Sequence, residues 1–120
     1  MKTTIYGIKN CNTMKKAFAW LDEHGVDYVF HDYKKDGVPV ERLKTWAQKL
    51  GWEKLANSRG PTWRKIPEGE RTGLTEPKAL KLLERHSSAI KRPVIETGAK
   101  LLVGFDEAGY EKTLIKSGKS

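Results

Sequence analysis

The chain has 120 residues, of which 38% are hydrophobic and 32% charged, and its formal net charge is +8. This length is typical of one domain, and we expect a single domain over residues 1–120 that is a monomer. No run approaches the roughly 20 apolar residues of a membrane span, so a membrane partner is not expected. A start without the pattern of a secretory signal, together with a lone cysteine, favours a cytoplasmic protein.

The positive charge raises the question of nucleic-acid binding, because clustered Lys and Arg bind phosphates. Here the basic residues are dispersed over different predicted elements, and neither a zinc-finger spacing nor an aromatic RNA-binding strand is present. We therefore expect no direct nucleic-acid contact. A small anionic substrate or an acidic partner would suit the same charge.

The first predicted elements are a strand, a turn and a helix, with the only cysteine at the turn. Residues 3–8 are β-branched and aromatic, whereas Met14, Phe18 and Leu21 recur at helical spacing. A helix start offers unpaired N–H groups and a partial positive charge, and the pKa of a thiol placed there can fall from about 8.5 to about 3.5–7.5. The position of Cys11 therefore predicts chemistry at sulfur.

A buried structural cysteine is the alternative interpretation, since free cysteine is among the most buried residue types. The polar run at residues 10–13 argues against burial. We expect Cys11 to be a nucleophile, and the backbone amides of Asn12 and Thr13 to donate to it at the helix start.

The remainder of the chain predicts further short strands and helices. We expect a strand over residues 26–33, a turn at 35–37, a helix at 39–50 ended by Gly51, a helix from Thr75 to near His86, strands at 94–96 and 100–103, and a helix at 106–116. Residues 57–70 show no regular spacing of apolar residues, which predicts a loop with one helical turn. Trp46 and Trp52 are expected in the core. The histidines lie in separate elements and predict no metal site.

The segments YGIKNCNTMKKA (6–17), SRGPTWR (58–64), IKRPVI (90–95) and VGF (103–105) together resemble the arsenate reductase (ArsC)/Spx family of thioredoxin-like proteins. The likeness is greatest to its YffB branch. The resemblance implies an α/β, thioredoxin-like mixed sheet in the order β-α-β … β-β-α, with a helical insertion at residues 38–88 between the second and third strands.

The resemblance also implies roles for individual residues. Pro93 would follow a cis peptide bond and lie beside Cys11. Arg92 would stabilise the thiolate, and the paired N–H groups of its guanidinium would bind an anion. Arg64 would be a second anion contact in a loop that faces the cysteine, ranked above Arg59. Without the resemblance, each of these arginines would be interpreted as an ordinary surface charge.

Two departures from the family pattern bear on the activity. Gly104 and Phe105 occupy the region of the third arginine of the arsenate-reducing branch, so one donor to a tetrahedral oxyanion is missing. Met14 stands where Spx-like regulators carry the second cysteine of a Cys-x-x-Cys pair, so a mixed disulfide on Cys11 must be resolved by another molecule. Glutathione is the natural cosubstrate, and we expect no tightly bound cofactor.

The leading hypothesis is a glutathione-dependent thiol reductase, a thiol-disulfide oxidoreductase that acts on a small anionic or oxidised thiol substrate. The alternative is a non-enzymatic, Spx-like regulator that binds RNA polymerase. Arsenate reduction is a third hypothesis, disfavoured by Gly104.

Overall fold

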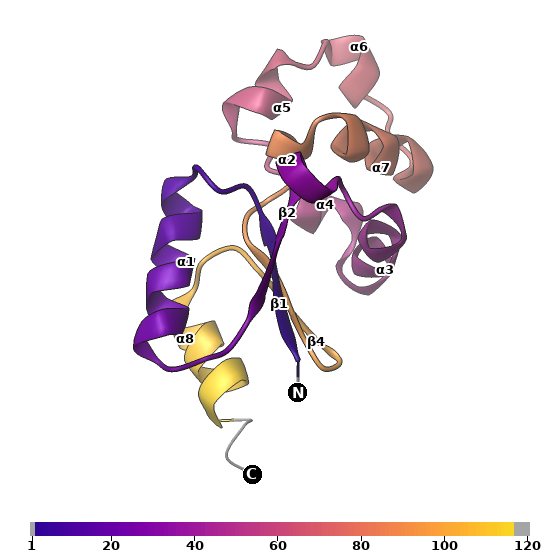
Figure 1. Ribbon diagram of the computed structural model, residues 1–120. Helices are drawn as coiled ribbons and strands as arrows, with labels where there is room; N and C mark the ends of the chain where they lie inside the picture. Colours follow the sequence, from indigo (N-terminus) through magenta and orange to yellow (C-terminus); the bar gives the residue numbers. More distant parts are fainter. Residues whose placement is uncertain (1, 117–120) are drawn as a thin grey trace. The chain divides into compact units, whose positions relative to one another are not determined.

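The computed structural model describes residues 2–116, which form two compact units (Figure 1). The first comprises the described residues up to Asp36 together with those from Arg92 onward, and the second is Gly37–Lys91. Within the described residues, no helix is both long enough and apolar enough to cross a membrane. The expected arrangement, one domain with an insertion at residues 38–88, stays a prediction.

The first unit is built on a mixed sheet of four strands in the order β2-β1-β3-β4. The strands are β1 (Thr3–Gly7), β2 (Val29–Asp32), β3 (Val94–Thr97) and β4 (Lys100–Val103). β1 pairs parallel with β2 and antiparallel with β3, and β3 pairs antiparallel with β4. The α/β class with a mixed sheet, and strands that follow one another along the chain as β-α-β … β-β-α, are confirmed.

Helices α1 (Asn12–Glu23) and α8 (Glu107–Tyr110) cover one face of this sheet (Figure 1). Met14 and Leu21 of α1 are fully buried against Ile5 and Ile95 of the sheet, and Tyr110 of α8 joins the same cluster. Their spacing on α1 is the apolar periodicity that predicted the helix. The final helix expected at residues 106–116 appears as α8 followed by the π-helical segment η2 (Glu111–Lys116).

The second strand, expected over residues 26–33, is shorter at both ends: β2 begins at Val29, and the chain turns after Asp32. Tyr33–Asp36 forms the short helix α2 instead of continuing the strand. The Asp32 carboxylate accepts a hydrogen bond from the Lys34 amide at 2.9 Å, and the Asp36 carboxylate accepts one from the Asp32 amide at 3.2 Å. Hydrogen bonds from backbone amides to aspartate side chains stabilise a turn here in place of further strand pairing.

The second unit is helical. Its elements are α3 (Val40–Leu50), α4 (Trp52–Leu55), α5 (Pro61–Lys65), α6 (Glu68–Arg71), α7 (Glu76–Arg85) and the 3₁₀ turn η1 (Ser87–Ala89). α3 contacts α4 and α7, and Leu43, Leu55 and Leu83 from these helices are fully buried. The helices expected at residues 39–50 and from Thr75 to near His86 are observed as α3 and α7, with bounds that agree to within one residue.

The expectation of a loop over residues 57–70 with one helical turn is wrong, because α5 lies wholly within this range and α6 begins in it. Both helices are too short to show a 3.6-residue period, and Pro61 at the start of α5 is the only local signal. Trp46 is fully buried as expected, whereas Trp52 is partly buried and stacks on Trp63 with ring centroids 6.2 Å apart.

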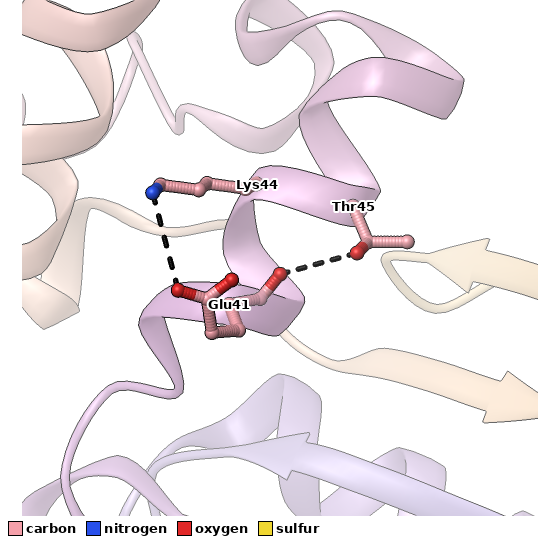
Figure 2. Close-up of polar contacts among 3 residues, drawn as sticks. All are labelled: Glu41, Lys44 and Thr45. Atoms are coloured by element: carbon pink, nitrogen blue, oxygen red, sulfur yellow. Dashed lines mark hydrogen bonds and ion pairs between the residues drawn. The ribbon is translucent and has the colours of Figure 1, made fainter.

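The outer face of α3 carries local polar contacts (Figure 2). The Thr45 hydroxyl donates to the Glu41 backbone carbonyl at 3.1 Å, and the Lys44 ammonium lies 3.9 Å from the Glu41 carboxylate. An exposed pair of this kind adds at most about 1 kcal/mol to stability. The stability of α3 therefore depends mainly on its buried face.

Gly51, between α3 and α4, has φ 88° and ψ 142°, a conformation that residues with a side chain rarely adopt. Gly51→Ala is expected to lower the free energy of unfolding by about 1–3 kcal/mol, measured by urea denaturation. Gly69→Ala is the matched control, because Gly69 lies in α6 with open space at its Cβ position and no positive φ. The control should be neutral or stabilising by about 0.4–1 kcal/mol. Equal losses in the two variants would contradict the backbone explanation.

Candidate active site

Cys11 lies at the N-cap of α1, directly after the loop that leaves β1. Its backbone is extended, with φ −147° and ψ 130°, and its carbonyl accepts the first helical hydrogen bond from the Lys15 amide at 3.0 Å. The first amides of a helix have no partner within the helix. The Cys11 side chain is partly buried and packs at the edge of the core of the first unit. It is therefore placed where unpaired N–H groups can meet the sulfur.

The surroundings of the Cys11 sulfur favour the thiolate. Partial burial raises the pKa of this thiol, but hydrogen bonds from the Met14 amide, the Arg92 side chain and the Thr13 amide lower it, as does the positive charge of Arg92. The net result is a Cys11 pKa below the ordinary value. Since the thiolate is the nucleophile, this sulfur is activated for attack on an electrophile such as a disulfide.

The pairing of β1 with β3 explains why Arg92 reaches this sulfur. In the antiparallel register Tyr6 lies opposite Val94, so the residues before β3 run beside the residues that follow β1. The Arg92–Pro93 peptide bond is cis, as the resemblance implied, and Pro93 is fully buried. The sheet thus brings Arg92 to Cys11 although they are far apart in sequence.

A partly buried polar cluster on the sheet was missed by the sequence reasoning. The Tyr6 hydroxyl donates to the Glu96 carboxylate at 2.6 Å. Tyr33 is only 3% exposed, and its pKa is raised above the ordinary value by burial and by the neighbouring Tyr6 and Glu96, while Arg92 opposes the shift. Strand alternation could have indicated that Tyr6 and Glu96 share a face, since both lie one residue from the buried Ile5 and Ile95.

The other predicted site residues are less closely tied to the sulfur. Asn12 is the first residue of α1, but its amide is not among the groups that lower the Cys11 pKa. Arg59 and Arg64 belong to the second unit, where Arg59 precedes α5 and Arg64 lies within it, and both side chains are exposed. The roles expected for these three residues stay predictions. Met14, whose amide donates to the sulfur, was not expected to contact it.

Comparison with known proteins gives the following relatives. A family model described as the ArsC family matches residues 6–113. A solved structure of a protein named YFFB is 47% identical, with a TM-score of 0.91 and coverage of 94% of this chain and 99% of that one. An uncharacterized protein of Haemophilus influenzae is 41% identical over 108 residues, which cover 90% of this chain and 95% of its own. The global transcriptional regulator Spx 2 of Bacillus cereus is 26% identical over 116 residues, which cover 94% of this chain and 87% of its own.

The pH dependence of Cys11 alkylation tests the role of Arg92. Arg92→Gln removes both a hydrogen bond and a positive charge from the sulfur, so the pKa of the thiol should rise and the thiolate fraction at neutral pH should fall. We expect iodoacetamide to react at least about threefold more slowly with this variant at pH 7. The rates of variant and parent should converge above the pKa of a free thiol.

Lys91→Gln is the matched control, because it removes an exposed positive charge from the adjacent position. It should leave the alkylation profile close to that of the parent. Equal slowing in both variants would show that the general positive charge, and not the contact with Arg92, activates the thiol.

Proposed function

The chain belongs to the ArsC family, and from this premise we propose that it is a glutathione-dependent thiol reductase with Cys11 as its nucleophile. The observation that carries the proposal is the set of donors at the sulfur: two backbone amides of α1 and the Arg92 side chain. The chain has one cysteine, so no internal disulfide can form and a second thiol must complete the reaction. A cytoplasmic location would provide reduced glutathione.

The proposed reaction proceeds in two exchanges. The Cys11 thiolate attacks the glutathione sulfur of a mixed disulfide R–S–S–glutathione, forming a Cys11–glutathione disulfide and releasing R–S⁻, which takes a proton from solvent. A second glutathione, as thiolate, attacks the glutathione sulfur of this intermediate. Oxidised glutathione then leaves, and Cys11 returns as the thiolate. The mixed disulfide and one glutathione thiol are thus converted to the thiol R–SH and oxidised glutathione.

Each site residue has a defined role in this scheme. Arg92 and the Thr13 amide hold the thiolate of Cys11 in its charged form between turnovers. Pro93 is fully buried, and it is proposed to lie beside the sulfur and contact the substrate. Asn12 is proposed to face the substrate at the helix start. Two arginines of the second unit, Arg64 and Arg59, are proposed to contact the carboxylates of glutathione.

Turnover of bis(2-hydroxyethyl) disulfide with glutathione, coupled to glutathione reductase and NADPH, tests the proposal. We expect catalysis above the uncatalysed exchange for the parent protein and none for Cys11→Ser, because a serine hydroxyl is a far weaker nucleophile at neutral pH. Ser58→Ala provides a control that alters an exposed hydroxyl. Equal rates for the parent and Cys11→Ser would exclude the reductase. Glutathione added at millimolar concentration should also shift the amide resonances of Thr13 and Arg92.

The similarity to Spx 2 supports a second candidate, a regulator that docks on RNA polymerase. A pull-down from cell extract separates the two proposals. Capture of polymerase by Cys11→Ala as well as by the parent, with no disulfide turnover, would favour docking. For arsenate we expect no turnover in the same glutathione assay, because Gly104 and Phe105 supply no guanidinium.

A further inference from the structure

A cavity of about 540 Å³ lies in the first unit, next to the residues that lead into Cys11. Its lining combines aromatic rings with positive charges. The rings are Phe18, Tyr28 and Phe30, and the charges are Lys9, Lys15 and Lys35. None of these residues has been assigned a role in the reaction above.

The aromatic part is a preformed wall. The rings of Phe18 and Tyr28 are stacked at 5.7 Å with planes 23° apart, and Phe30 meets Phe18 edge-on at 5.0 Å. All three rings are partly buried and rest against the core cluster of the sheet and α1. The Tyr28 hydroxyl donates to the Asp22 carboxylate at 3.4 Å, so its polar end already has a partner. The rings are therefore held in place and can contact a flat apolar group.

The charged part of the lining has an excess of cations available to a ligand. Lys9, Lys15 and Lys35 are exposed, and within the described residues none of them pairs with a carboxylate. The two lining carboxylates, Asp32 and Asp36, accept hydrogen bonds from backbone amides of the turn at α2. The positive groups can thus move to an incoming anion, whereas the negative groups are engaged in the turn.

The strand register explains the position of the cavity beside the nucleophile. Gly7 lies opposite Asp32 in the parallel pair β1 and β2, so both strands end at the same edge of the sheet. Lys9 and the neighbouring Asn10 line the cavity and lead directly to Cys11. The Lys15 amide bonds to the Cys11 carbonyl, one turn along α1. Cys11 itself is not part of the lining, but its chain neighbour Asn10 is, so the cavity and Cys11 lie at the same edge of the sheet.

We propose that this cavity binds an anion with an aromatic body, and that it holds the R group of the mixed disulfide. The aromatic wall takes the flat part of R, and the lysines take its carboxylate or a similar anion. The favoured substrates are then mixed disulfides of glutathione with thiols that carry an aromatic acid. The assignment of the cavity to R rests on the proposed reductase function, whereas binding of the aromatic anion does not.

Binding is tested first, on Cys11→Ser protein, so that the result is independent of catalysis. 2-Naphthoate is titrated while amide resonances are recorded by NMR, with neutral 2-naphthamide as the comparison. We expect shifts at Phe18, Phe30 and Asn10, and weaker binding of the amide. Lys15→Gln should raise the naphthoate Kd about two- to fivefold, the range expected for one exposed ion pair.

Lys16→Gln is the matched control, because it makes the same charge change at the next position of α1, and Lys16 does not line the cavity. It should leave the Kd within about 1.5-fold. The proposal is overturned if naphthoate shifts resonances elsewhere, if the neutral amide binds equally well, or if the two variants weaken binding equally.

Turnover then tests the link to the reaction. Glutathione mixed disulfides of 4-(mercaptomethyl)benzoate and of 4-(mercaptomethyl)benzamide have similar leaving groups and differ in charge. We expect kcat/KM to be about two- to fivefold higher for the acid, and Lys15→Gln with Lys35→Gln to remove this preference. Equal kcat/KM values in the parent would overturn the assignment of the cavity to R. If naphthoate binds as expected but neither disulfide is reduced, the binding site stands and the reductase function fails.

Discussion

The hydrogen bonds that reach the Cys11 sulfur from the start of α1 and from Arg92 are the interactions on which the site depends. Partial burial alone would raise the pKa of this thiol and make the sulfur less reactive. The Met14 and Thr13 amides and the Arg92 guanidinium outweigh that effect. A reactive sulfur therefore requires a helix that begins at one residue and a strand that delivers an arginine to the same point.

The mixed sheet meets both requirements because β1 has one parallel and one antiparallel neighbour. The antiparallel neighbour β3 begins where β1 ends, which brings Arg92 to the sulfur. The parallel neighbour β2 ends where β1 ends, which brings Asp32 and the α2 turn to the other side of the loop before Cys11. One central strand thus places the thiolate donors and the aromatic, lysine-rimmed cavity at a single edge of the sheet.

Much of this fold could be predicted from local pattern, and the failures have identifiable physical causes. Gly51 was correctly taken as the end of α3, because few other residues adopt its backbone conformation. The chain turned after Asp32 because side chains bonded to the backbone, which strand alternation does not register. The reach of Arg92 to Cys11 depends on pairing between distant strands, so only the family resemblance indicated it. The helix start indicated that backbone amides would face the sulfur, but residue type does not show which amides of the first turn reach it, so the Met14 amide was missed.

Met14 shows how the same position serves the fold and determines the chemistry. Its side chain is fully buried in the core of the first unit and reaches the backbone of Gly7, where an added Cβ would meet its terminal atoms. Its amide meanwhile donates to the Cys11 sulfur. Because a thioether cannot exchange with a disulfide, the residue that supports the thiolate cannot resolve a mixed disulfide formed on it. An external thiol is then a chemical requirement of any disulfide turnover by this chain, and the space around Cys11 must admit both that thiol and the group it displaces.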